Sequence, residues 1–110
     1  MELSRKPTEI EKKLLRLLIS KSVISFSTDW ENDLRVSPMN DGGMGGLYLH
    51  PKEALENKRI FGRQISEYQY KDIDGVDVII SLYVDDNDNL YELDIWKTNF
   101  NKLINYPSLA

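Results

Sequence analysis

One stretch of the sequence decides the fold: residues 63–97, which read RQISEYQYKDIDGVDVIISLYVDDNDNLYELDIWK. β-branched and aromatic residues fill three runs, 63–72, 76–85 and 90–97, and these residue types favour strands. Asp74-Gly75 separates the first two runs, and the DNDN sequence at 86–89 separates the last two. Both segments are typical of hairpin turns, so we predict an antiparallel three-stranded meander.

Turn chemistry predicts the register of this meander. An even-length turn after Asp85 gives only apolar partners, which are Val84 with Tyr91, Leu82 with Leu93 and Ile80 with Ile95. A three-residue loop at 73–75, with Gly75 in the left-handed conformation, places Tyr70 beside Val78 and Tyr68 beside Ile80. A two-residue turn would instead put charged residues on this apolar face, so we favour the longer loop.

The chain before the meander predicts a helix over residues 8–21. Thr8-Glu9-Ile10-Glu11 forms a capping box, and Leu14, Leu17 and Leu18 follow at helical spacing. We expect this helix to cover the apolar face of the sheet. The predicted fold class is α+β, with an N-terminal helix on an antiparallel sheet of four to six strands, in a single domain spanning residues 1–110.

The opposite face of the meander mixes acidic and aromatic side chains. The register predicts three rows: Glu67, Ser81 and Asp94; then Ile65, Tyr83 and Glu92; then Gln69, Ile79 and Trp96. This face is either half exposed to water, covered by a loop, or used for recognition, because exposed aromatic rings among polar groups favour binding.

A glycine-rich segment, residues 38–46 (PMNDGGMGG), precedes a short strand predicted at 47–50. It lacks the Gly-Lys-Ser/Thr ending of a phosphate-binding loop. Its glycines permit positive φ and close backbone approach, or a loop whose amides receive an anion or a partner's backbone. Elsewhere, residues 23–28 are either a strand or a helix continuation, and 34–36 are a weak strand. Residues 51–61 form a turn or one helical turn. We expect the tail from Phe100 to pack on the domain through Leu103, Ile104 and Tyr106.

The charge is uneven along the chain. The sequence holds 14 basic and 18 acidic residues, for a net charge of -4, and the excess comes from residues 65–110. This acidity serves solubility, or it meets a basic partner or a cation. It argues against nucleic-acid binding. No apolar run is long enough to span a membrane and no targeting signal is visible, so we expect a cytoplasmic protein without a membrane partner.

The residues offer little for catalysis. There is no cysteine, and His50 is the only histidine, so a Ser-His-Asp triad would have to use it. Glu67 and Asp94 could do acid–base work only in a cleft. Asp-rich turns lack the spacing of a calcium loop. We therefore assign no catalytic residue, metal or cofactor, and lean against an enzyme.

Three segments carry a resemblance: PMNDGGMG at 38–45, DIDGV at 72–76 and ELDIWK at 92–97. Together they resemble the signature of a small bacterial domain family of unknown function. The resemblance extends over most of the chain, and it implies a bacterial, soluble, single-domain protein without supplying an activity.

These observations predict a non-enzymatic module that binds a protein with a basic surface, for example an immunity-type inhibitor of a basic toxin or effector domain. The candidate binding residues are Asp41, Gly43, Met44, Glu67, Ser81, Tyr83, Glu92, Asp94 and Trp96. The alternative is a small ligand-binding or hydrolase-like site between the Gly42–Gly46 loop and Glu92, Asp94 and Trp96.

Overall fold

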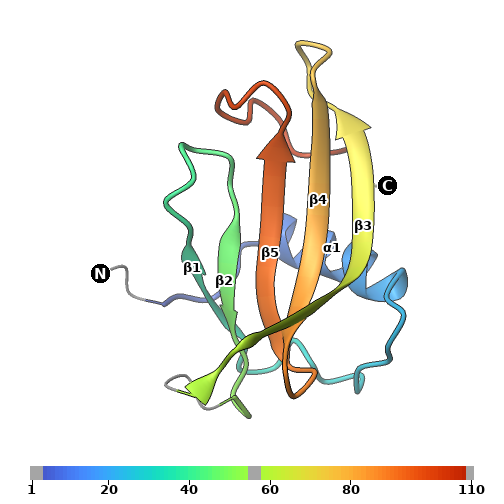
Figure 1. Cartoon of the computed structure of the whole chain (residues 1–110), viewed down its shortest axis with the longest axis vertical. Coiled ribbons are helices and arrows are strands. Elements are labelled where there is room, and N and C mark those ends of the chain that lie inside the picture. Colours follow the sequence, from blue (N-terminus) through green and yellow to red (C-terminus); the bar gives the residue numbers. More distant parts are fainter. Residues whose placement is uncertain (1–3, 55–57, 109–110) are drawn as a thin grey trace.

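The computed structural model describes residues 4–54 and 58–108. Within them, one helix precedes a five-stranded antiparallel sheet, so the predicted α+β class is confirmed (Figure 1). The spatial strand order is β1-β2-β5-β4-β3. The elements are α1 (Glu9–Ser20), β1 (Arg35–Pro38), β2 (Leu47–His50), β3 (Phe61–Lys71), β4 (Asp77–Asp85) and β5 (Leu90–Lys97).

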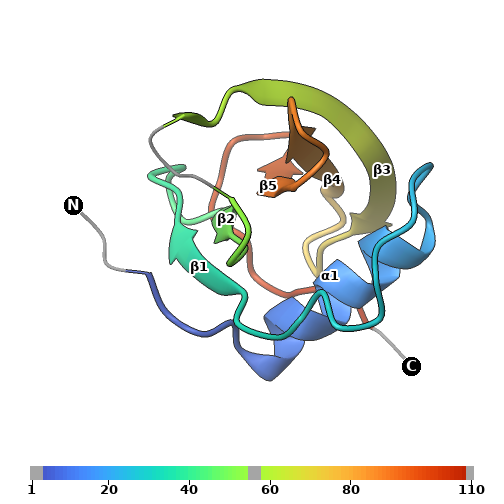
Figure 2. The same ribbon diagram turned by 90° about the horizontal axis from the view of Figure 1, so that it is seen from below.

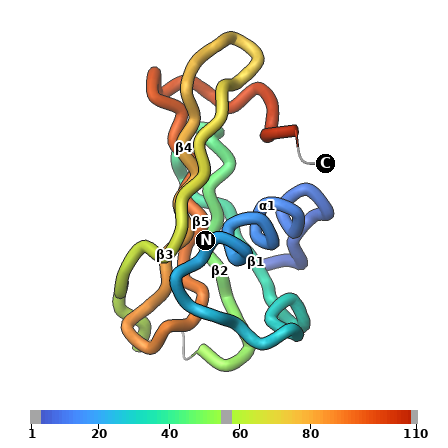
Figure 3. Tube along the Cα trace, turned by 90° about the vertical axis from the view of Figure 1, so that its right-hand side faces the viewer, coloured from blue at the N-terminus to red at the C-terminus, as the bar shows by residue number. Residues whose placement is uncertain are grey.

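Helix α1 lies across one face of the sheet, as Figures 1 and 3 show from two directions. The predicted capping box is present, because Thr8 accepts from the Glu11 amide while the Glu11 side chain accepts from the Thr8 amide. Leu14, Leu15 and Leu18 are fully buried against the sheet. Burying each leucine contributes roughly 1.5–3 kcal/mol, so this apolar stripe holds the helix in place. We call the sheet side under α1 the inner face and the other side the outer face.

The predicted register is confirmed for most of the meander. Asp72 N–H donates to Val76 O (2.9 Å), and Gly75 has φ +79°, as the three-residue loop requires. Tyr70 pairs with Val78 and Tyr68 with Ile80, while Ile80 pairs with Ile95 and Leu82 with Leu93.

The predicted pairing of Val84 with Tyr91 is wrong. A β-bulge follows Tyr83, and Val84 pairs with Leu90 instead. The extra residue removes Tyr91 from the inner face. Its ring lies under the Arg59 guanidinium, 4.8 Å from the centroid.

Strand β3 bends strongly and wraps around the lower end of the sheet (Figure 2). Two irregularities interrupt its pairing, between Phe61 and Arg63 and between Gln64 and Ser66. The second one places Gln64, rather than Ile65, opposite Tyr83, and Ile65 is buried in the core. The predicted row of Ile65, Tyr83 and Glu92 is therefore wrong in its first member.

The structure also decides the conformation of the segments for which the sequence left alternatives open. Residues 23–28 form neither strand nor helix, and the weak strand expected at 34–36 is β1, which begins at Arg35. Residues 51–54 form a turn, whereas 55–57 of the predicted 51–61 turn lie outside the described residues. The tail packs on the domain through Leu103 and Tyr106, while Ile104 stays exposed.

Candidate functional site

The outer face of β5 carries Glu92, Asp94 and Trp96, because alternate residues of a strand point to opposite sides. Two predicted rows are present: Glu67 pairs with Ser81 and Ser81 with Asp94, while Gln69 pairs with Ile79 and Ile79 with Trp96. Strand β2 extends the face, since Tyr48 pairs with Glu92. The side chains of this face therefore come from four strands.

Ion pairs engage more than half of the acidic side chains in the C-terminal half. Five of its acids contact a lysine or arginine: Asp72, Asp74, Asp77, Asp85 and Asp88. Among the described residues, four acids of this half have no such contact: Glu67, Asp86, Glu92 and Asp94. Three of these four lie on the outer face, so the free negative charge of this half is concentrated there.

Glu92 and Asp94 are half-buried carboxylates without a compensating charge. Burial raises the pKa of Glu92, and the neighbouring Asp94 raises it further. Burial also raises the pKa of Asp94, with Asp41 as the second cause. The surroundings of Glu92 and Asp94 therefore disfavour their ionised forms. A cationic group placed beside them would reduce the free-energy cost of ionisation.

Asp41 organises the glycine-rich loop beside this face. Its two carboxylate oxygens accept from the amides of Met44 (3.0 Å) and Gly46 (2.8 Å). A Cβ atom at Gly46 would lie 2.7 Å from Asp41 Oδ2, so a larger residue at this position would displace the Asp41 carboxylate. The loop thus places the Asp41 carboxylate close enough to act on Asp94.

Exposed aromatic rings border the carboxylates. Tyr48 is 43% exposed and Trp96 42%. The ring of Phe100, which is 71% exposed, lies 6.1 Å from that of Trp96. Phe100 also has φ +63°, a conformation that a bulky residue rarely adopts. The structure therefore holds a large apolar ring in solvent at a cost in backbone strain.

Two predicted binding residues, Ser81 and Met44, are buried. Tyr83 is half-buried, and the centroid of its ring lies 5.2 Å from that of Phe61. Gly43 is exposed but contacts the tail, because its carbonyl accepts from Leu103 N–H and its Cα faces the Lys102 side chain. Of the predicted side chains, Glu67 and Trp96 are exposed, and Asp41, Glu92 and Asp94 are half-buried.

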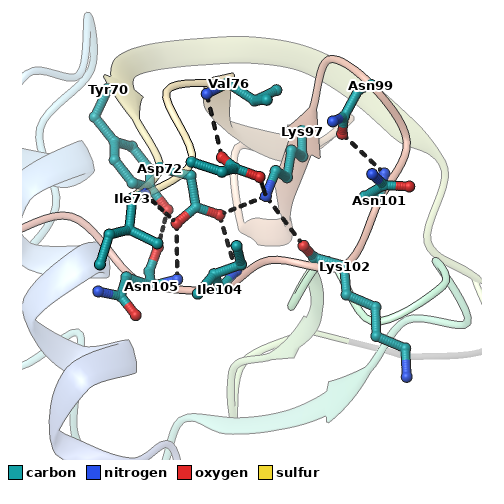
Figure 4. A network of polar contacts seen from close by, with 11 residues as sticks. Tyr70, Asp72, Ile73, Val76, Lys97, Asn99, Asn101, Lys102, Ile104 and Asn105 are labelled. Atoms are coloured by element: carbon teal, nitrogen blue, oxygen red, sulfur yellow. Dashed lines mark hydrogen bonds and ion pairs between the residues drawn. The ribbon is translucent and has the colours of Figure 1, made fainter.

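Lys97 builds a buried polar network that the sequence reasoning missed (Figure 4). It lies on the inner face and is fully buried, and its ammonium group donates to Asp72 (2.9 Å) and Asp74 (2.7 Å). Burial opposes its charge, yet these hydrogen bonds hold the pKa of Lys97 above its usual value. The signal was present in the sequence, since Lys97 follows Leu93 and Ile95 at strand spacing.

Asp72 ties this network to the tail. Its carboxylate also accepts from the amides of Ile73, Ile104 and Asn105 at 2.7–2.9 Å. Burial would raise the pKa of Asp72, but these donors and Lys97 hold it well below its usual range. The Asp72 carboxylate in this Asp-rich turn therefore accepts hydrogen bonds from donors of the protein itself, in keeping with the turn-forming role of the segment.

A second unforeseen contact joins β1 to β2. Ser37 Oγ lies 2.8 Å from His50 Nε2, so the lone histidine pairs with a serine thirteen residues earlier. Sequence reasoning could not find it, because both strands are short and their pairing depends on the whole sheet. Within residues 4–54 and 58–108, no three His, Cys, Asp or Glu side chains are grouped to hold a metal ion.

Comparison with known families gives one match. The model for Domain of unknown function (DUF6984) covers residues 4–107. The chain belongs to this family. The resemblance to a small domain family of unknown function is thereby confirmed, and no curated protein or solved structure matches the chain.

The DUF6984 match includes all the elements described above, from the segment before α1 to the tail. In this chain, the DIDGV segment and the end of the ELDIWK segment meet in the buried network of Lys97. The described part of the chain contains no helix long and apolar enough to cross a membrane.

Proposed function

We propose that this DUF6984 domain is a non-enzymatic protein-binding module of the bacterial cytoplasm. Its outer face binds a partner through a lysine- or arginine-rich surface. The observation that carries this proposal is the pair Glu92 and Asp94, which are half-buried and uncompensated. An inhibitor that covers a basic toxin or effector site is one form of this function.

Charge complementarity supports a basic occupant. A lysine or arginine placed between Glu92 and Asp94 would lower both of their raised pKa values and make charge-assisted hydrogen bonds. Asp41 and Glu67 extend the same negative potential to either side of Asp94. Such a potential also accelerates encounter with a basic protein.

The aromatic rings supply the apolar contact area that a charge cluster lacks. Tyr48, Trp96 and Phe100 border the carboxylates, and large rings of this kind often dominate binding energy at protein interfaces. The N–H of Phe100 donates to Lys97 O (2.9 Å) in a turn where Phe100 has positive φ, and backbone strain of this kind clusters at functional positions.

The shape of the face favours a protein over a small molecule. Its side chains come from four neighbouring strands of one sheet, and Tyr48, Glu67 and Trp96 are exposed on it. The outer face thus offers charge and rings on an open sheet, which suits a partner surface better than a ligand-sized pocket.

The test compares two variants of equal net charge. Wild type, Glu92→Gln/Asp94→Asn and the control Glu9→Gln/Asp86→Asn are used to capture proteins from cell extract, and the captured partner is purified. Titration calorimetry should then show a dissociation constant at least about ten-fold weaker for Glu92→Gln/Asp94→Asn. The control should bind within about two-fold of wild type, since Glu9 and Asp86 are exposed and belong to neither the outer face nor its bordering loop.

Trp96→Ala gives an independent arm, because it removes a ring without changing the charge. We expect a loss of at least about 2 kcal/mol in binding free energy for an interface centred on this ring. A partner that binds wild type, Trp96→Ala and Glu92→Gln/Asp94→Asn equally would contradict the proposal. The proposal would also be contradicted if the charge-matched control lost the captured basic proteins to the same extent as Glu92→Gln/Asp94→Asn.

A further inference from the structure

A groove at the β1 edge of the sheet has the opposite chemistry to the acidic set of Glu67, Glu92 and Asp94. It lies between the segment before α1, the turn leading into β1 and the turn after β2, and its volume is about 720 Å³. Ligand sites usually fall between roughly 300 and 1,000 Å³. Among the residues that the structure describes, four cationic side chains line it, Lys6, Lys12, Arg35 and Lys52, against two acidic ones, Glu31 and Asp33.

Most of these charges are already compensated. Arg16, outside the groove, donates two hydrogen bonds to Glu31, at 2.7 and 2.8 Å. Lys12 contacts Glu9 at 3.3 Å, and Lys52 contacts Asp33 at 3.8 Å. Among the described residues, neither Lys6 nor Arg35 has a carboxylate partner. The groove therefore keeps two uncompensated positive charges in a protein of net charge -4.

The backbone brings these two cations together. Arg5 forms an antiparallel bridge with Val36, so the next pair across the bridge is Lys6 and Arg35 (Figure 2 shows the N-terminal segment running beside β1). Like charges placed opposite each other in such a pairing are destabilising. An anion between the two side chains would remove that repulsion.

Arg35 is held in position by neutral groups. Its Nε donates to Ser4 Oγ (3.0 Å) and one terminal nitrogen donates to Ser4 O (2.7 Å). These contacts fix the guanidinium plane without cancelling its charge, and they leave the second terminal nitrogen for another acceptor. A preorganised guanidinium of this kind suits the geometry of phosphate and carboxylate groups.

We propose that this groove binds a small anionic molecule, whose phosphate or carboxylate group lies between Lys6 and Arg35. The groove also has apolar walls, from Pro7, Leu34 and Pro51. These walls would receive the less polar remainder of the ligand. The proposal is independent of the proposed protein-binding residues, because none of them lines the groove.

The test is an NMR titration of ¹⁵N-labelled protein with four probes: pyrophosphate, citrate, adenosine monophosphate and adenosine. We expect adenosine monophosphate to shift the amide signals of Lys6, Arg35 and His50 saturably, whereas uncharged adenosine leaves them in place. Saturation by pyrophosphate alone would assign a phosphate ligand, and saturation by citrate alone would assign a carboxylate ligand.

Two double variants decide whether the named cations bind. Lys6→Gln/Arg35→Gln should weaken binding at least about ten-fold, since it removes both charged donors. The control Lys71→Gln/Arg63→Gln removes the same charges from exposed positions of β3 and should bind within about two-fold of wild type. Lys6→Gln alone, at an exposed position, repeats the test if the double variant fails to fold.

Three results would overturn the proposal. Shifts that grow linearly without saturation indicate only general ionic effects. Equal weakening in the control shows that net charge, rather than the groove, attracts the anion. Adenosine binding as tightly as its monophosphate shows that the anionic group does not contribute.

Discussion

Asp72 and Asp94 are both partly or fully buried aspartates of the same meander, yet their surroundings have opposite effects. Asp72 accepts from Lys97 and from three backbone amides, and its pKa lies well below the usual range. Asp94 has no hydrogen-bond or ion-pair partner among the described residues, and its pKa is raised. Burial acts in the same direction on both, so the donors make the difference.

This contrast separates scaffold from surface. The Asp72 end joins the β3–β4 turn to β5 and to the tail, and its carboxylates are used by the fold (Figure 4). On the outer face, Glu92 and Asp94 have no cationic partner, and their ionised forms cost stability. Perturbed carboxylates of this kind cluster at functional sites, which is why we propose a binding function for the outer face.

The largest effect expected from this contrast is that of Lys97→Met. The change leaves Asp72 buried without its cation, and breaking one side of a buried ion pair is strongly destabilising. We expect thermal unfolding to show a Tm lower by at least about 10 °C. Lys71→Met, which breaks an exposed pair with Asp77, is the control and should stay within about 2 °C. Equal decreases in Tm for Lys97→Met and Lys71→Met would contradict the distinction between the buried and the exposed ion pair.

The next effect concerns acid. A depressed folded-state pKa means that Asp72 stabilises the protein above the unfolded pKa of about 3.9, and that this contribution is lost as the pH falls toward the folded value. Asp72→Asn should lower the Tm by roughly 5 °C at pH 7. The difference in Tm between Asp72→Asn and wild type should become smaller as the pH falls from about 4 to about 2. A difference that stays constant over that range would contradict the charged role of Asp72.

Removal of the outer-face charges should act in the reverse direction. Glu92 and Asp94 have raised folded-state pKa values, so their ionised forms cost stability at pH 7, and the cost disappears as the pH falls through those values. Glu92→Gln/Asp94→Asn should raise the free energy of unfolding by a few tenths of a kcal/mol (~0.3–0.6), a small gain because water screens both groups. Urea unfolding curves at pH 7 and pH 3.5 measure it, and a destabilised variant at pH 7 would show that these acids serve the fold.

The smallest effect is expected at Phe100. Asparagine tolerates its positive φ better, so Phe100→Asn should leave the stability unchanged or raise it by up to about 1 kcal/mol. The same variant should weaken partner binding, because it removes an exposed ring beside Trp96. A clear loss of stability in urea unfolding would instead assign this ring to the core.

Much of the scaffold could be read from local patterns. The capping box at Thr8, the glycine at position 75 and the apolar alternation of β4 and β5 each act over a few residues, and the structure has them as predicted. The errors lie at bulges, where one inserted residue moves Tyr91 and Ile65 to other faces. The position of a bulge depends on how β3 bends around the sheet, and a few consecutive residues do not predict that bend.

The candidate site was only partly predictable for the same reason. The alternation of residues along β5 is enough to place Glu92, Asp94 and Trp96 on one side of the strand. The exposure of Ser81, Met44 and Tyr83 depends on what covers them, and the covering groups include Phe61, which arrives from a distant position in the chain. Ser37 and His50 meet only because β1 and β2 pair.

By itself, then, the sequence determined the α+β class, the meander with its first turn, and the grouping of acids with aromatic rings on one face. Those features follow from periodicity and turn chemistry, which are local. Only the tertiary structure decided which acids have a cationic partner: Lys97 forms ion pairs with Asp72 and Asp74, whereas Glu92 and Asp94 are left without a cation. Pairing of charges depends on distances between segments far apart in the chain, and these distances exist only once the sheet has closed around its core.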